Sequence, residues 1–287
     1  MPDDEITEAS RRKKSGKTDF GSIAGVALAL AAILGGLVLE GGRLRDVAQF
    51  TAALIVLGGT AGAVLISMPL NVVKRALRRL VGVFFDPAMP VAGMVEELIG
   101  YATQARKSGL VSLEQVTEKI EDPFLRKALM LAVDGTDLQE MRGMLELIIE
   151  VEEQHAEAEA KVFESAGGYA PTIGIIGAVL GLIQVMKNLA NIEEVGHGIA
   201  VAFVATVYGV GMANLFFLPV ANKIKTRSMS AIRRKEIIIE AVSGIVEGLN
   251  PKLIRMKLEA YADSPSKKKR APRHKSEDAE QPAGAEA

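Results

Sequence analysis

The sequence contains no cysteine and no tryptophan, and aromatic residues make up only 5% of its 287 positions. The lack of cysteine excludes disulfides, thiolate metal sites and cysteine nucleophiles. The chain also has little net charge, because 34 basic residues against 35 acidic residues leave a formal charge of −1. Since whole-molecule attraction to nucleic acid needs a strong positive charge, no nucleic-acid partner is expected.

Histidine is also scarce, and its three copies, His155, His197 and His274, lie far apart in the chain. His155 has carboxylates at helical spacing, those of Glu152 and Glu159, and such mixtures are common on solvated helix faces. The sequence shows no Ser/His/Asp arrangement, phosphate-binding glycine loop or zinc motif. We therefore expect neither an enzyme, nor a metal site, nor a cofactor.

What the sequence does have is long apolar segments. Hydrophobic residues make up 49% of the chain, and many of them gather in four runs without an interior charge. Each run has about 20 residues, enough to cross a bilayer as a helix. A soluble protein with buried helices is the alternative, but the recurrence of such runs favours a membrane protein. We predict an all-α membrane protein whose four transmembrane helices form two pairs.

The first predicted pair occupies residues 20–70. Its first span is Phe20–Leu39, a hydrophilic turn follows at Glu40–Asp46, and the second span runs from Val47 to about Leu70. A basic start followed by an apolar run is also typical of a signal peptide. This run is longer than a signal core, and a second span follows almost at once, so a retained helix is expected. Basic residues on both outer sides of the pair place its ends in the cytoplasm.

Residues 71–165 form a predicted cytoplasmic, helical insertion. Apolar periodicity predicts four helices, over Met94–Lys107, Leu113–Ile120, Phe124–Val133 and Leu138–Phe163. Gly109 is expected to end the first helix, while Asp122–Pro123 and Asp134–Gly135 mark the start and stop of the third. The last helix is rich in glutamate, which indicates a solvated face; contact with a partner protein is the alternative.

The second predicted pair occupies residues 166–221, with an outward loop at Lys187–His197, and basic residues follow it. Residues 222–262 are predicted to be cytoplasmic, with an amphipathic helix over Ile237–Leu249. Residues 1–19 are polar and basic, and residues 263–287 have the composition of a disordered tail, whose KKKR run offers contact with anionic lipid. Both chain ends are therefore expected in the cytoplasm.

The predicted spans offer wall positions for an ion path but no proton carrier, because their interiors contain no ionisable side chain. On the fourth span Thr206, Gly209 and Ala213 share one helix face, and Asn214 lies at its edge. A hydroxyl beside small residues suits a narrow ion path. Alternatively, Thr206 bonds its own helix, Asn214 bonds a neighbouring helix, and the glycines only aid packing.

The third span carries a comparable stripe of small residues, Gly174, Ala178 and Gly181. Each of these spans also contains a proline near its cytoplasmic end, Pro171 in the third and Pro219 in the fourth. A proline removes one helix hydrogen bond and can bend the helix. The two prolines either transmit a conformational change from the spans to the cytoplasmic insertion, or they are ordinary residues of helix ends.

Several segments resemble the flagellar motor stator family of MotA and its sodium-driven relative PomA. The signature-like segment is AFVATVYG at 202–209, which runs on to Pro219. GGYAPTIGIIGAVLGL at 167–182 is similar to the family's third span, and ARKSGLVSLE and IEDPFLRKALMLAVDGTD are similar to its cytoplasmic region. The resemblance covers residues 20–260 and implies an ion-conducting stator subunit in the bacterial inner membrane.

The resemblance also implies partners. Such subunits form a ring, expected to be a pentamer, around two copies of a MotB-like protein that is anchored to peptidoglycan. The span of this partner bears an aspartate, which would supply the carboxylate that the present spans lack. Ion flow would turn the ring against the rotor protein FliG.

By position in the family, Thr206 is expected to face the ion path, and Pro171 and Pro219 to take part in torque-producing conformational change. Arg106 and Glu114 match a charged pair that meets charges on FliG, as suits steering and repeated release.

Two positions bear on the ion path in other ways. Ala178 stands where sodium-using members tend to carry a threonine, and the missing hydroxyl favours protons over sodium as the coupling ion. Asn214 matches no family position and rests on helix geometry alone.

Two other readings are weighed against a motor stator. Relatives of ExbB and TolQ energise outer-membrane processes but have a single span before their cytoplasmic region, whereas this chain has the hairpin at 20–70. A passive membrane scaffold gives no reason for Thr206, Pro171 and Pro219 to occur together.

Overall fold

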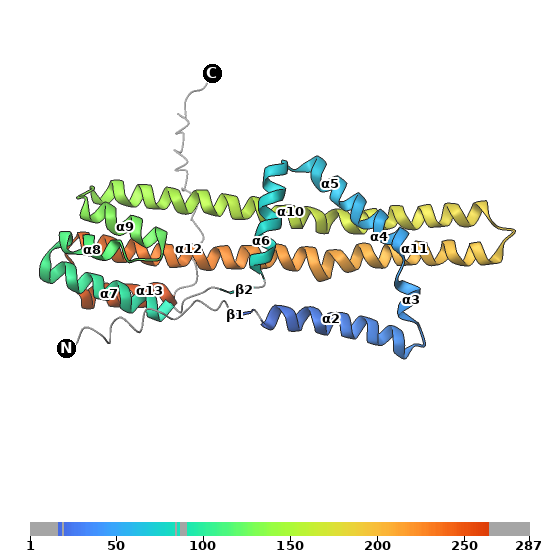
Figure 1. Cartoon of the computed structure of the whole chain (residues 1–287), viewed down its shortest axis with the longest axis horizontal. Coiled ribbons are helices and arrows are strands. Elements are labelled where there is room, and N and C mark those ends of the chain that lie inside the picture. Colours follow the sequence, from blue (N-terminus) through green and yellow to red (C-terminus); the bar gives the residue numbers. More distant parts are fainter. Residues whose placement is uncertain (1–16, 19, 84, 87–90, 264–287) are drawn as a thin grey trace, which may run out of the picture.

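The structure is a computed structural model that describes residues 17–18, 20–83, 85–86 and 91–263, and these residues are almost entirely helical. Its spine consists of two long antiparallel arms that lie side by side (Figure 1). The first arm is α10 (Leu138–Lys187); the second comprises α11 (Ile192–Met212), the π-helical turn η4 (Ala213–Phe217) and α12 (Leu218–Val246). Asn191, which accepts from the Glu193 N–H at 3.2 Å, begins the second arm.

The helix predicted over Leu138–Phe163 is not separate, and that prediction is wrong. α10 has 50 residues and continues through Pro171 into the apolar segment. At 1.5 Å per residue it is about 75 Å long, more than twice the hydrocarbon thickness of a bilayer. The hydrogen bond lost at Pro171 does not end the helix, because small residues pack it closely against the second arm.

The helix predicted over Ile237–Leu249 is also not separate. Its residues up to Val246 are the end of α12, which begins at Leu218. Gly248, with φ +70°, ends this arm, and α13 (Pro251–Asp263) follows. Both arms therefore cross the boundaries expected between membrane and cytoplasmic parts at residues 165–166 and 221–222.

The first helix, α2 (Phe20–Leu39), has the predicted bounds. A broken helical run follows, made of α3 (Leu44–Val47), α4 (Phe50–Ala53), the π-helical η2 (Leu54–Gly58) and α5 (Gly59–Ser67). It ends before Pro69, so Leu70 is not the end of the second span but the start of α6 (Leu70–Val83).

Three helical runs in the described part of the chain are long and apolar enough to cross a membrane: Leu44–Ser67, Leu138–Lys187 and Ile192–Val246. α2 contains a shorter apolar stretch, Ile23–Leu39. The number of four spans therefore stays a prediction.

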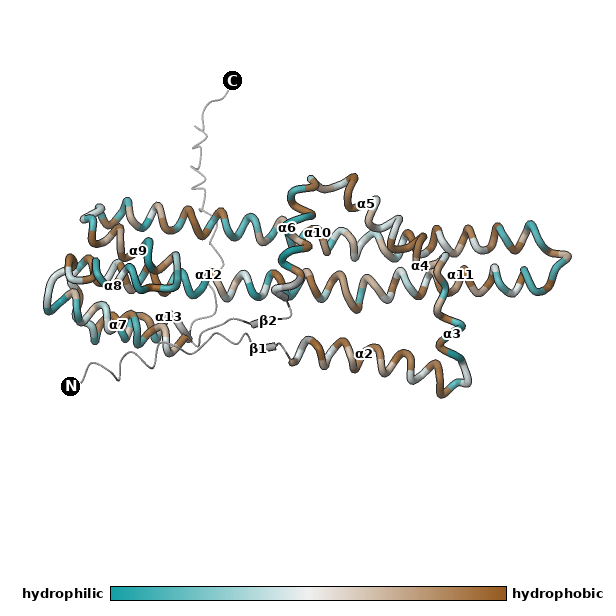
Figure 2. The backbone as a smooth tube through the Cα atoms, viewed as in Figure 1, coloured by the Kyte–Doolittle hydropathy of each residue, from teal (hydrophilic) through white to brown (hydrophobic). Residues whose placement is uncertain are grey.

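Figure 2 shows that hydrophobic residues dominate α2 and the halves of both arms beside it. Large apolar side chains lie on their outer faces; Phe203, for example, is 71% exposed, and Leu28 of α2 is similarly exposed. Among the described residues of α2 none is buried. Apolar surface of this extent marks contact with lipid or other protein chains.

The opposite end of the spine carries a helical lobe (Figure 1). It consists of α7 (Val91–Ser108), the 3-10 turn η3 (Leu110–Leu113), α8 (Glu114–Thr117), α9 (Pro123–Val133) and α13. Buried residues such as Leu98, Leu129, Met141 and Ile238 join the lobe to both arms in one core. A short antiparallel pair, β1 (Lys17–Thr18) with β2 (Phe85–Asp86), lies between the lobe and α2.

The turn signals of the lobe are confirmed. Gly109 ends α7 with φ +82°, and Gly135 follows α9 with φ +73°. Asp122 caps α9 by accepting from the Phe124 N–H at 2.8 Å, with Pro123 in the first turn. The helix predicted over Leu113–Ile120 is too long, because only η3 and the four-residue α8 form there.

Glu240 joins three helices of the lobe region. Its carboxylate on α12 accepts from Arg142 of α10 at 3.2 Å and from Lys257 of α13 at 3.1 Å. Burial alone would raise the pKa of Glu240, but the bonds from Lys257 and Arg142 outweigh burial and lower that pKa. The ionised carboxylate is thus the form that stabilises this junction.

Replacing Glu240 by glutamine should therefore lower stability in a pH-dependent way. Because the folded pKa lies below the unfolded value of about 4.3, the stabilisation is complete above that pH and disappears as pH falls through the folded pKa. At pH 7 we expect E240Q to lose about 1 kcal/mol, as for partly exposed ion pairs. Thermal unfolding of the purified full-length chain in detergent measures the difference. The exposed Glu146→Gln variant is the control. A stability difference between E240Q and the unchanged chain that does not vary with pH would contradict the stabilising role of the ionised Glu240 carboxylate.

Candidate functional site

The apolar halves of α10 and α11 touch through their backbones at two glycines. A Cβ added to Gly209 would lie 2.5 Å from the carbonyl oxygen of Ala170 and 3.2 Å from the Cα of Pro171. A Cβ added to Gly174 would lie 2.9 Å from the carbonyl oxygen of Ala205. The two distances to carbonyl oxygens are shorter than those that real Cβ atoms show. Only glycine therefore permits the observed separation of the two helices.

The same contact recurs further from the lobe. A Cβ on Gly181 would lie 2.8 Å from the Gly198 carbonyl oxygen, and a Cβ on Gly198 would lie 3.0 Å from the Gly181 carbonyl oxygen. The stripe predicted on the third span thus packs against α11 at Gly174 and Gly181. Ala178, between them, is half-buried.

Thr206 lies at the edge of this contact and is half-buried. Its Oγ1 donates to the Ala202 carbonyl oxygen at 3.2 Å, one turn back on the same helix. A hydroxyl that donates in this way keeps its oxygen lone pairs as acceptors. Thr206 can therefore bond its own helix and still present an oxygen to a path along α11.

Asn214 also bonds its own arm. Its Nδ2 donates to the Val210 carbonyl oxygen at 2.9 Å, and the residue is exposed. The alternative of a bond to a neighbouring helix is not what the structure shows. Asn214 belongs to η4, the π-helical turn that ends two residues before Pro219.

The turn of α10 that precedes Pro171 lies beside the turn of the second arm that contains Leu218. Gly167, whose carbonyl would accept a bond from position 171 in a regular helix, packs against Leu218, the residue before Pro219. A Cβ on Gly167 would lie 2.7 Å from Leu218 Cδ2. The π-helical η4 widens the arm where the ring of Pro219 would clash with the preceding turn. The turn before Pro171 therefore lies beside Leu218, whereas Pro171 itself packs against Gly209, ten residues before Pro219.

Tyr208 links α11 to the first helix pair, a role that the sequence analysis missed. Its hydroxyl donates to the Val47 carbonyl oxygen at 2.5 Å and accepts from the Gln49 N–H at 3.4 Å. A tyrosine within an otherwise small and apolar run was the available signal, because a half-buried hydroxyl needs a polar partner.

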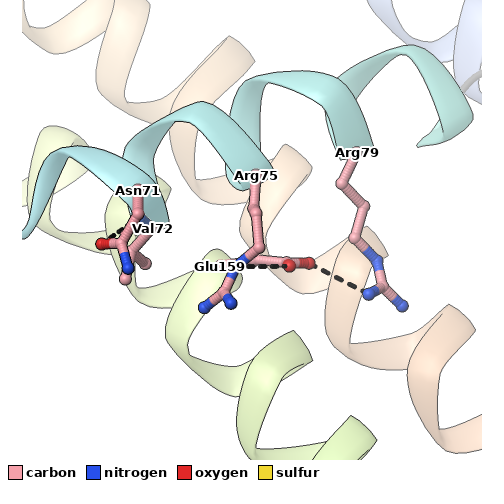
Figure 3. Close-up of polar contacts among 5 residues, drawn as sticks. All are labelled: Asn71, Val72, Arg75, Arg79 and Glu159. Atoms are coloured by element: carbon pink, nitrogen blue, oxygen red, sulfur yellow. Dashed lines mark hydrogen bonds and ion pairs between the residues drawn. The ribbon is translucent and has the colours of Figure 1, made fainter.

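Glu159 forms a second unpredicted contact, with two arginines of α6 (Figure 3). It is only 5% exposed, and its carboxylate lies 3.0 Å from Arg79 Nη1 and 3.6 Å from Arg75 Nε. The expectation of a solvated acidic face is therefore wrong at this position. Glu159 lies three residues after Ala156 and four before Phe163, both buried, and this spacing placed it on the inner face.

The remaining acidic residues of this region are mostly exposed, but they do not form a metal site with His155. Within the described residues no group of three or more histidine and carboxylate side chains is suited to hold a metal ion. His155 is exposed, Glu159 is bound to the two arginines, and Glu152 pairs with Lys235.

Arg106 and Glu114 lie on either side of the turn at Gly109, in the lobe. Both are exposed. Gln104 Nε2 donates to the Ser112 carbonyl oxygen at 2.8 Å and braces the turn between them. The structure thus presents opposite charges on a fixed turn at the end of the molecule far from α2 (Figure 1).

Comparison with known proteins covers nearly all of the described chain. The MotA/TolQ/ExbB proton channel family matches residues 116–237, and the Motility protein A N-terminal family matches residues 23–107. Motility protein A of Bacillus subtilis is 37% identical over 247 residues, which are 85% of this chain and 90% of that protein.

Two solved structures are also similar. The C. jejuni MotAB structure aligns with a TM-score of 0.82 at 35% identity and covers 86% of this chain and 98% of its own. The flagellar MotAB stator complex from Bacillus subtilis aligns with a TM-score of 0.79, also at 35% identity, over 84% and 95%.

The contact at Gly209 can be tested against a glycine of the same helix that lacks it. Gly211 has open space where a Cβ would lie. Alanine raises helix propensity by about 1 kcal/mol at either position, so their difference isolates the clash with Ala170. We expect Gly209→Ala to be less stable than Gly211→Ala by about 1–3 kcal/mol, as for overpacked cores. Thermal unfolding of the two full-length variants in detergent measures this, and equal midpoints would refute the backbone contact.

Proposed function

The chain belongs to the MotA family of flagellar motor stator subunits, and on that basis we propose that it couples inward proton flow to torque on the rotor. As a stator subunit it is an ion-conducting membrane protein and not an enzyme. Its likeness to MotAB structures supports a MotB partner, an oligomeric assembly and a multi-pass position in the inner membrane. The match of residues 23–107 to the motility family disfavours the ExbB/TolQ alternative.

The finer assembly that we propose is a ring of five copies around two MotB-like chains that are anchored to peptidoglycan. Each copy would cross the membrane four times, with α2 as the first span and both termini in the cytoplasm. The exposed apolar faces of α2, α10 and α11 support this arrangement, because one chain alone leaves them uncovered.

We assign the ion path to the exposed side of the α10–α11 contact. The aspartate of the MotB-like partner would carry the ion, since the apolar halves of the arms have no ionisable side chain. Thr206 would accept a hydrogen bond from the incoming water or carboxyl group. Ala178 offers no side-chain oxygen for sodium, which supports protons as the coupling ion. Asn214, two turns beyond Thr206, would meet the path near its cytoplasmic end.

Torque would pass from the prolines to the lobe. Pro171 lies at the Gly209 contact, and Gly167, one turn before it, packs against Leu218 beside Pro219, so a change in the path would reach both arms. Each arm then continues as helix into the lobe, where Arg106 and Glu114 would meet charges on FliG. Exposed charges of this kind favour rapid binding and release.

The test of the stator role is a strain that lacks this chain and any second stator set. Because the rotor and filament are separate from the stator, we expect normal flagella, counted by electron microscopy, that do not turn. Cells that still swim but fail in iron-siderophore uptake would overturn the proposal in favour of an ExbB-like role. In the complemented strain, swimming should persist without sodium and stop when the proton gradient is collapsed; a sodium requirement would reject protons as the ion.

Pro171→Ala should abolish swimming while the subunit still reaches the membrane and binds its partner. Alanine restores an N–H for the Gly167 carbonyl and thereby stiffens α10 in the turn beside Leu218. The control is Pro251→Ala, because Pro251 is the first residue of α13, where a missing N–H costs no helix bond. Membrane fractionation and tethered-cell rotation are the measurements. Normal rotation of the Pro171→Ala strain would exclude this coupling role.

A further inference from the structure

Helix α6 lies where the apolar part of the spine meets its polar part. It starts three residues after Ser67 ends the apolar run of the first pair. Figure 1 shows that α6 runs across the two arms instead of along them, and Figure 2 shows the mainly hydrophobic halves of both arms on one side of it. A helix that crosses the spans at this level lies parallel to the membrane surface.

One side of α6 is fixed to the spine. Ala76 is fully buried, and Val72, Val73 and Leu80 pack against a core that includes Phe163 of α10. The guanidinium groups of Arg75 and Arg79 point to Glu159 on α10, whose carboxylate compensates part of their charge within the protein (Figure 3).

The outer side of α6 is different. Leu70 and Leu77 are 57% and 54% exposed, and Lys74 and Arg78 beside them are also exposed. The four residues stand at i, i+4, i+7 and i+8, which places them on one face of the helix. Lys74 and Arg78 form no ion pair with any residue that the structure describes. Leucines beside uncompensated cations on a helix along the surface are typical of interfacial helices.

We propose that this outer face of α6 binds anionic phospholipid headgroups of the cytoplasmic leaflet. Leu70 and Leu77 enter the edge of the hydrocarbon, and Lys74 and Arg78 bind the phosphates. Because Arg75 and Arg79 both point to Glu159, the preference for anionic lipid rests mainly on Lys74 and Arg78. The lipid then holds α6 from outside while Glu159 holds it from within.

The cysteine-free chain allows a direct test. Leu77→Cys in the full-length complex is labelled with bimane and reconstituted in vesicles that contain spin-labelled phosphatidylglycerol or phosphatidylcholine at equal mole fraction. We expect quenching by both lipids, and about twofold or greater quenching by the phosphatidylglycerol, because each basic residue near the surface attracts anionic lipid. A label at Val111, which is 68% exposed in the lobe, should not be quenched.

A charge variant separates headgroup binding from simple proximity to lipid. In Lys74→Gln/Arg78→Gln the quenching ratio of the two lipids should fall to about one, whereas Lys107→Gln/Lys127→Gln, which removes two exposed cations from the lobe, should keep it. Gel filtration and thermal unfolding show that each variant is assembled. Equal quenching by both lipids in the unchanged chain would overturn the proposal. An unquenched label at position 77 would also overturn the proposal, because the outer face of α6 would then contact water or protein and not lipid.

Discussion

Direct backbone contact between α10 and α11 is the constraint on which the rest of the structure depends. It requires glycine at positions 174, 181, 198 and 209, and it fixes the separation of the two arms along their apolar halves. Thr206 lies at the edge of this contact and Pro171 within it, so the ion path and the proposed coupling point share one interface. Tyr208, two residues after Thr206, adds the bond that holds the first helix pair to the same region.

The charged contacts have a different role, because they connect elements that apolar packing alone does not orient. Glu159 sets the position of α6 at the level where the spine becomes polar. Glu240 sets the positions of α10, α12 and α13 relative to one another in the lobe. Each carboxylate is largely covered and binds two cations, which offsets the cost of removing it from water.

The sequence was sufficient for the helical class, the bounds of α2, the turns at Gly109 and Gly135 and the small-residue stripe, because each of these depends on local composition or on one helix face. It did not predict that α10 and α12 continue from the apolar region into the lobe. The proline at 171 and the basic residues after 222 are typical of the ends of spans. Packing against the neighbouring arm nevertheless keeps α10 and α12 continuous at these positions. The pairs of Glu159 and Tyr208 join residues 80 and 161 positions apart, and no local pattern specifies such partners.

The continuity of α10 also has a mechanical consequence. About 33 residues separate Pro171 from the start of the helix, which at 1.5 Å per residue makes a lever of about 50 Å. A tilt of about 5° at the proline would then displace the far end of the helix by about 4 Å, close to the width of one side chain. A stiff helix without an intervening hinge thus amplifies a small local rearrangement into a stroke large enough to exchange one surface contact for the next.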